Sequence, residues 1–454
     1  MSGCHRSSAV RRAVLAVVAL GASGLGSHAA FAVPAFARQT GQECAACHVG
    51  GFGPQLTPFG KQFKLGGYTL TDGKSGHIPL SAMLVGTFVH TDKDQSADAG
   101  PHEDDNNNTS LQEASVFLAG RITDHLGSFV QGTYSDISRD VSMDNLDVRY
   151  ARTVDFLGKS TIFGVTLNNN PTVTDVSNAV PAWRFPYMAS ELVPGSLASP
   201  LIDGGLEQQV IGASAYTMWN EAVYAEVGGY RSLSRSTLDD LNVDDDAGRL
   251  GSLSPYWRLG YSTDVCGGAF STGLFGMNAN LHPGREPGRS DKYRDVGVEA
   301  SYQYLGDRRN IYTLNTSYID EQIERDGSVA LGDAASPTGK VNRFDLSASY
   351  FRDQTWGLTA AVFDISGDRD PSLYAPEADA GSRKGSADTT GLTLQADWTP
   401  FGKENSWKAP NANLRLGVQY TMYDKFNGAS SNYDGFGRDA SDNNALFLFA
   451  WTAF

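Results

Sequence analysis

Two cysteines and a histidine near the N-terminus have a spacing that suits one kind of chemistry. Cys44 and Cys47 are three residues apart, and His48 follows directly in the run Cys-Ala-Ala-Cys-His. Two thiols at this spacing share one helical face and can bond the two vinyl groups of one haem, while the adjacent imidazole coordinates the iron. The pattern predicts one covalent haem c, with Cys44 and Cys47 as attachment points and His48 as proximal ligand.

Three other interpretations of the motif are a disulfide, half of a zinc site and a chance match. A zinc site needs two further ligands, and no second Cys/His pair follows at finger spacing. A thioredoxin-type dithiol needs a βαβ context, which the sequence lacks. Haem is therefore favoured over all three.

The sixth ligand of the haem iron is open at this stage. No methionine lies between His48 and Met83, and Met83 falls with His90 in the first predicted strand. His77 is the candidate distal ligand, and its alternative is a solvated loop histidine. A histidine pair suits electron transfer, whereas an open position permits ligand chemistry.

Short helices are expected to position the motif. Thr40 and Glu43 have capping-box spacing, which would start a helix just before the first cysteine. A second helix is expected with Thr57 as its N-cap and Pro58 in its first turn, ending at the glycines 66–67.

The segment 33–78 is a predicted monohaem cytochrome unit that is too short to bury a core of its own. Phe59 and Phe63 would share a helix face and cover the apolar surface of the haem. The segment must pack against a larger structure, and we expect it to lie in the lumen of a barrel formed by 79–454.

The N-terminus is typical of a bacterial secretory signal peptide. Arginines precede an apolar run at 13–20, and small residues follow it. The peptide is placed at 1–32, with cleavage as late as 37 as the alternative. After its removal, Cys266 is the one cysteine outside the motif; it lies in a predicted tight turn, so no disulfide framework exists.

Everything after about residue 80 predicts an all-β transmembrane barrel. Glycine is abundant at 50 residues and aromatics make up 11%, and no later stretch approaches the ~18 apolar residues of a membrane helix. Segments of about ten residues alternate in hydrophobicity instead. In 411–423, Leu414, Leu416 and Val418 would face lipid, while Arg415 and Gln419 would face a polar lumen.

Sixteen antiparallel strands are expected, and an even number is what bacterial barrels require. Connections after odd-numbered strands are mostly long and those after even-numbered strands mostly short, which places both termini and the haem segment on the periplasmic side. The expected strands are 80–90, 111–121, 126–136, 143–152, 160–169, 207–218, 220–231, 254–265, 268–278, 292–304, 308–320, 340–352, 355–365, 388–399, 411–423 and 444–453.

The predicted loops carry most of the acid in a chain of net charge −15, which makes nucleic acid an unsuitable partner. The carboxylates at 103–105, 239–240 and 244–246 could attract ferrous ions, but solvated loops are the favoured interpretation. The loop 170–206 is different, because its aromatic residues and prolines are too apolar for simple exposure. It is expected to fold inward and narrow the lumen, with packing on the rim or against another subunit as the alternatives.

The run ARQTGQECAACH at 37–48 and the run LTPFGKQFKLGGY at 56–68 resemble the outer-membrane cytochrome–porin fusions that act as ferrous iron oxidases. The resemblance covers some thirty residues, and over the barrel only the architecture matches. It implies one haem c on Cys44, Cys47 and His48, and a porin of about sixteen strands in the bacterial outer membrane.

The leading hypothesis for function is a one-electron oxidoreductase that takes electrons from extracellular Fe(II). The acceptor would be a periplasmic c-type cytochrome, and the barrel would contact outer-membrane lipid. One alternative is a porin or transporter with a haem-bearing plug. Another alternative is that the protein delivers electrons outward to extracellular acceptors, since the sequence does not give the direction of electron flow. A peroxidase is a weaker alternative.

Overall fold

The computed structural model describes residues 34–454 except 75, 180, 246, 404–405 and 407–410, so the expected signal peptide at 1–32 lies outside the described residues. The described helices are α2 (Pro34–Thr40), α3 (Cys44–Cys47), α4 (Pro58–Leu65), α5 (Arg235–Leu241) and α6 (Asp326–Leu331), with short helical turns η1 (Val49–Gly51), η2 (Pro171–Thr174), η3 (Pro181–Trp183), η4 (Leu201–Gly205), η5 (Pro283–Arg285) and η6 (Ala440–Asn443). None of these helices is both long enough and apolar enough to span a membrane.

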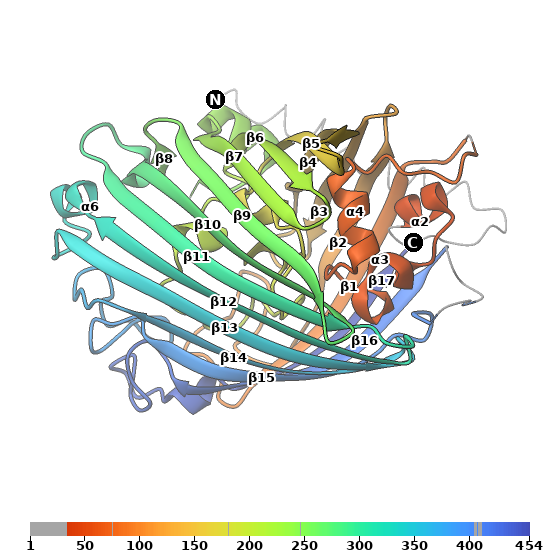
Figure 1. The fold of residues 1–454 in the computed structure, drawn as a ribbon. Helices are drawn as coiled ribbons and strands as arrows, with labels where there is room; N and C mark the ends of the chain where they lie inside the picture. Colours follow the sequence, from red (N-terminus) through yellow and green to blue (C-terminus); the bar gives the residue numbers. More distant parts are fainter. Residues whose placement is uncertain (1–33, 75, 180, 246, 404–405, 407–410) are drawn as a thin grey trace, which may run out of the picture.

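The rest of the chain forms one antiparallel sheet that closes on itself (Figure 1). The pairing of β1 with both β2 and β17 completes the barrel. The strands are β1 (Leu80–Thr91), β2 (Asn108–Arg121), β3 (Leu126–Ser135), β4 (Asp140–Phe156), β5 (Lys159–Asn168), β6 (Val210–Trp219), β7 (Val223–Ser232), β8 (Arg249–Leu250), β9 (Ser254–Val265), β10 (Gly268–His282), β11 (Asp291–Tyr304), β12 (Asn310–Glu324), β13 (Thr338–Arg352), β14 (Trp356–Gly367), β15 (Thr389–Trp398), β16 (Asn413–Lys425) and β17 (Ala445–Ala453).

Short β8 and long β9 occupy one position in the wall, because both pair with β10. The barrel therefore has sixteen wall positions, and the predicted fold class and strand number are confirmed. The largest boundary errors are at the ends of β4, β10 and β12, which each extend four residues further than expected, and β6 and β7 each start three residues later than expected. Asn220 and Glu221 adopt left-handed backbone conformations, and the turn takes three residues where one was predicted.

The outer face of the wall is apolar, and its inner face carries buried charged and polar side chains together with the aromatic residues of β17, whereas the interior of a soluble barrel is mainly apolar. Val227 and Leu259 point outward with 65% and 53% of their surface exposed, whereas Arg258 and Arg415 point into the lumen and are each 1% exposed. Lipid covers an apolar outer band in membrane barrels. This pattern confirms the faces predicted for 411–423 and defines an outer-membrane type of barrel.

The helices α2, α3 and α4 lie at the end of the barrel where the short turns gather, and α6 and the longer loops lie at the other end (Figure 1). One short turn joins β9 to β10 through Cys266, a free and exposed cysteine in a left-handed conformation, as the sequence predicted. The strand bounds also show the expected alternation between short connections at one end of the barrel and mostly long connections at the other.

Close packing inside the lumen predicts that Gly417 does not tolerate a side chain. Gly417 pairs with Phe449 across β16 and β17, and an added Cβ would lie 2.1 Å from the Phe449 ring. Gly417→Ala should lower the free energy of unfolding by about 1–3 kcal/mol, measured by urea titration in lipid. The control is Gly86→Ala in β1, where nothing lies within 4 Å of the added atom. If the two variants had the same free energy of unfolding, the close packing between β16 and β17 at this position would be contradicted.

Candidate functional site

The Cys-Ala-Ala-Cys-His motif is held in a tight hairpin between α3 and α4. The Thr57 hydroxyl accepts from Gly60 N at 3.2 Å as the predicted N-cap of α4, and it donates to Ala46 O at 2.5 Å. The amide of Thr57 also donates to Cys47 O at 2.9 Å. One residue thus both starts α4 and fixes α3 against it.

The expected capping box in front of the first cysteine is wrong. Thr40 is the last residue of α2, a helix that was not predicted, and its hydroxyl donates back to Phe36 O at 2.8 Å. Glu43 precedes α3 without making a side-chain cap. The threonine hydroxyl is satisfied within α2, so it is not available to α3.

The segment 34–78, called the plug from here on, is fastened to distant parts of the barrel wall. Its side chains and carbonyls bond to β4, β11 and β16, which surround the lumen. The bonds run from Tyr68 Oη to Asp147 Oδ2 at 2.6 Å, from Gln303 Nε2 to Leu56 O at 2.9 Å and from Asn413 Nδ2 to Gly51 O at 2.8 Å. The plug therefore lies inside the lumen, as the sequence predicted.

The loop 170–206, called the inserted loop, folds inward onto the plug. The Lys64 ammonium at the end of α4 donates to Val173 O at 2.6 Å, Asp175 O at 2.7 Å and Asn178 Oδ1 at 2.6 Å. Burial, with a smaller contribution from Arg149, lowers the pKa of Lys64 to about 7. One lysine thus ties the inserted loop to the plug and confirms the expected inward fold.

A cavity of about 630 Å³ separates the plug from the inserted loop, and Cys44, Cys47 and His48 all line it. Cofactor sites in proteins typically measure about 300–1,000 Å³ and are mostly apolar. The aromatic residues in the wall of this inner cavity are Phe36, Phe52, Phe63, Tyr68, Phe117, Phe129, Trp183, Tyr187 and Trp451.

The residues of the motif fit covalent haem. Both cysteines are free, and burial raises the pKa of Cys44 and raises that of Cys47 to about 12. A structural zinc site needs four ligands, and the described part of the chain has no group of three or more His, Cys, Asp or Glu side chains that could hold a metal ion. Burial lowers the pKa of His48 to about 4, and its Nδ1 is buried without a hydrogen-bond partner among the described residues. A neutral imidazole is the form that binds a metal.

The structure does not bring His77 to the motif. Its Nε2 lies 3.0 Å from Asp72 Oδ1 in a partly exposed loop, and it is not among the residues that line the inner cavity. Phe59 is also displaced: it is 38% exposed, whereas Phe63 is buried and lines the cavity. The expectation that both rings face the haem is therefore wrong for Phe59.

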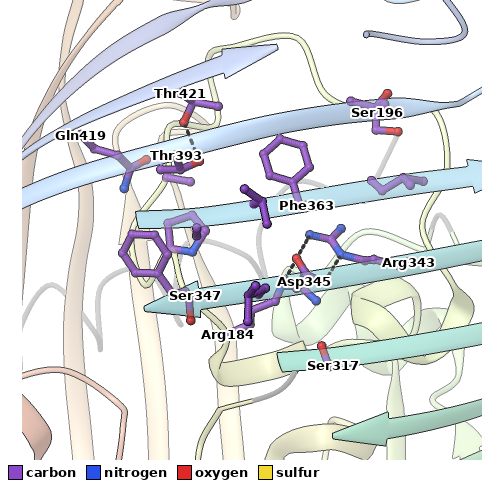
Figure 2. Close-up of a pocket in the computed structure, with 18 of the residues that line it drawn as sticks. Arg184, Ser196, Ser317, Arg343, Asp345, Ser347, Phe363, Thr393, Gln419 and Thr421 are labelled. Carbon is purple, nitrogen blue, oxygen red and sulfur yellow. Dashed lines mark hydrogen bonds and ion pairs between the residues drawn. The ribbon is translucent and has the colours of Figure 1, made fainter. Parts of the chain in front are cut away.

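A second cavity of about 230 Å³ lies beyond the inner one, and Figure 2 shows the side chains around it. The two cavities share four wall residues: Arg184, Pro186, Ala189 and Arg343. This outer cavity is rich in hydroxyl and amide groups from the wall, including Ser347, Thr393, Gln419 and Thr421 (Figure 2).

Four charged residues form the partition between the cavities. Arg184 and Asp203 belong to the inserted loop, while Arg343 and Asp345 belong to β13. Arg343 Nε lies 3.1 Å from Asp203 Oδ2 and 2.9 Å from Asp345 Oδ2, and Arg184 Nη1 lies 3.0 Å from Asp203 Oδ1. Each charge has an opposite neighbour, so the inserted loop is fixed to the wall without a net charge in the partition.

Sequence reasoning missed several groups that line the inner cavity, among them Met188, Trp451 and the carboxyl groups of Glu113, Asp144 and Glu207. For residues in strands, the alternation of apolar and polar residues predicts which side chains face inward, but not how deep in the lumen they lie. For residues of the inserted loop, the apolar composition of the loop was the one sequence feature that indicated a position inside the lumen.

No protein-family model and no curated protein sequence matches the chain. Solved structures with a similar fold include OprB of Pseudomonas putida, with 11% identity, 83% of this chain and 94% of that chain covered and a TM-score of 0.48. The outer-membrane channel DcaP of Acinetobacter baumannii has 10% identity, coverages of 83% and 96% and a TM-score of 0.47. The anion-selective porin from Comamonas acidovorans has 11% identity, coverages of 82% and 98% and a TM-score of 0.43.

The closed sheet of sixteen wall positions, with its exposed apolar outer face, makes the chain an outer-membrane type of β-barrel. A helical plug and an inserted loop lie inside its lumen.

Docking of the inserted loop on Lys64 gives a direct prediction. Lys64→Met should leave three buried acceptors without their donor and weaken the docking by about 2 kcal/mol. Hydrogen–deuterium exchange of the 170–178 backbone should then accelerate. The control is Lys74→Met, which removes a lysine whose side chain is 80% exposed. Unchanged exchange in Lys64→Met would show that the loop is held elsewhere.

Proposed function

We propose that the chain is an outer-membrane electron-transfer protein with one covalent haem c, and that it oxidises extracellular Fe²⁺. The observation that carries the proposal is the position of Cys44, Cys47 and His48 on an aromatic cavity inside a plugged barrel. In the net reaction Fe²⁺ loses one electron to become Fe³⁺, and the ferric haem of a periplasmic c-type cytochrome gains that electron to become ferrous.

The residues of the motif have distinct roles in this proposal. Cys44 and Cys47 hold the haem through thioether bonds, and His48 holds the iron. When bound, the haem supplies a one-electron carrier inside the barrel. The aromatic side chains of the cavity would cover the apolar surface of the haem, and burial of this kind tunes the potential of a haem. Transfer of one electron needs no catalytic acid or base.

The lengths of the loops support the orientation that we propose for the barrel. Short turns lie on the periplasmic side of outer-membrane barrels and long loops outside, so the plug faces the periplasm and the inserted loop enters from the cell surface. The motif would then be open to a periplasmic partner, while the inserted loop and partition separate it from the exterior. Insoluble ferric product would thus stay outside the cell.

A porin or transporter with a haem-bearing plug is the second candidate, because a wide barrel with a polar wall is equally what solute passage requires. The fold is common to both candidates. They differ in whether the lumen conducts, and the plug, the inserted loop and the partition all lie across it.

The first experiment is stopped-flow absorbance of the purified chain mixed with Fe²⁺. Rapid reduction of a covalent haem is expected in the wild type and in Cys266→Ser, which changes the cysteine outside the motif. The Cys44→Ser/Cys47→Ser double variant should carry no covalent haem on a denaturing gel. A haem that stays oxidised with excess Fe²⁺, yet is reduced by periplasmic-type donors, would reject iron oxidation and favour outward delivery.

Ion conductance in planar bilayers separates the electron-transfer proposal from the porin. The wild type is expected to conduct little, because the plug and the inserted loop occupy the lumen and the partition joins the inserted loop to the wall. The double variant Arg343→Ser/Asp345→Ser removes the two partition residues that belong to β13, and it should raise the conductance several-fold. The control is Lys292→Ser/Glu324→Ser, which removes an ion pair whose side chains are 57% and 58% exposed. Steady porin-like conductance of the wild type would favour the transporter.

A further inference from the structure

The inner cavity also limits what could bind the second axial position of the iron, an inference that rests on the proposed function. Haem iron in proteins is ligated by histidine, cysteine, methionine or tyrosine. The side chains of these types that line the inner cavity, besides the motif itself, are Tyr68, Met83, Tyr187 and Met188.

The two tyrosines already have partners. Tyr68 donates to Asp147 Oδ2 at 2.6 Å, and Tyr187 donates to Gln55 Oε1 at 3.2 Å. Lys64 also lines the cavity, but its ammonium is held by three acceptors. The thioethers of Met83 and Met188 are left, since a thioether needs no deprotonation to bind iron.

We propose that Met188 is the second axial ligand. It belongs to the stretch 181–189 of the inserted loop, of which all but Phe185 line the inner cavity, whereas β1 contributes Met83 alone. The stretch forms a wall of the cavity that the plug does not supply. A ligand on this wall would close the haem between two elements that are far apart in sequence.

Hydrogen bonds hold Met188 and its neighbour Tyr187 in place. Gln419 Nε2 of β16 donates to Met188 O at 3.0 Å. The neighbouring Tyr187 hydroxyl bonds to Gln55, and Val49, next to His48, donates its amide to Gln55 O at 3.0 Å. The two candidate ligands are therefore joined through Gln55, which holds the inserted loop to the motif hairpin.

Histidine–methionine ligation raises the reduction potential of a haem. A higher potential favours uptake of an electron from an external donor over its delivery outward. Met188 would thereby help to set the direction that the sequence alone could not give.

The test is the absorption spectrum and midpoint potential of the purified holoprotein with Met188→Leu, a substitution that nearly conserves volume. The ferric wild type should show the weak red charge-transfer band of a thioether–iron bond. Met188→Leu should lose this band, lower the potential and bind carbon monoxide when reduced. Met83→Leu is the matched control and should keep the band. Met188→His should give a low-spin haem of lower potential.

Each other outcome overturns the proposal. A band that survives in Met188→Leu and disappears in Met83→Leu would assign the ligand to β1. A wild type that has covalent haem but lacks the band would mean that no thioether binds the iron, while the proposed electron transfer would stand. A wild type without covalent haem on a denaturing gel would reject both proposals.

Discussion

The number of wall positions is the constraint on which the rest of this structure depends. In lipid every backbone amide and carbonyl needs a partner, so the sheet must close, and β1 closes it by pairing with β17. A barrel of about eight strands is filled by its own side chains, whereas one of sixteen leaves an open lumen. The wide lumen provides the space that the plug and the inserted loop occupy.

Charges and hydrogen bonds act together with buried apolar clusters to hold these two inserts in place. Phe52 of the plug and Met188 of the inserted loop share one such cluster with Trp451 of the wall. Arg149 lies inside the lumen with its Nε 2.8 Å from Asp147 Oδ2, and the same carboxylate accepts the Tyr68 hydroxyl of the plug. Arg258 pairs with Asp175 of the inserted loop at 2.8 Å. Loss of one member would leave a buried charge without its partner, which is strongly destabilising. The polar wall is therefore both the lumen lining of a membrane barrel and the binding surface for its inserts.

The inner cavity is a product of this arrangement, because no single element encloses it. The hairpin supplies Cys44, Cys47 and His48, the wall supplies residues such as Trp451, and the inserted loop supplies Trp183 and Tyr187. The Arg184–Asp203 and Arg343–Asp345 pairs bound it on the side of the outer cavity. A cavity that is bounded by the plug, the wall and the inserted loop is a property that a buried electron carrier and a plugged channel share.

The sequence by itself determined the motif, the strands and the face of the wall to which most residues belong. Spacing such as that of Cys44 and Cys47 is set within one helical turn, and a period of two along a strand places Leu414 outside and Arg415 inside. Thr57 and Pro58 likewise start α4 by local chemistry. Thr40 was assigned to the wrong helix, because its hydroxyl bonds back to Phe36 O at the end of α2 instead of capping the next helix.

Only the tertiary structure decided what meets inside the lumen. Lys64 and Val173, or Gln55 and Tyr187, lie more than a hundred positions apart in sequence and come together because the barrel closes around them. His77 had the right chemistry for a ligand but lies in a loop beside Asp72, and Met188 lines the cavity although no local pattern marked it. The local spacing of residues encodes helices and strands. The residues that line a cavity depend instead on the closure of the barrel and on the path of the inserted loop.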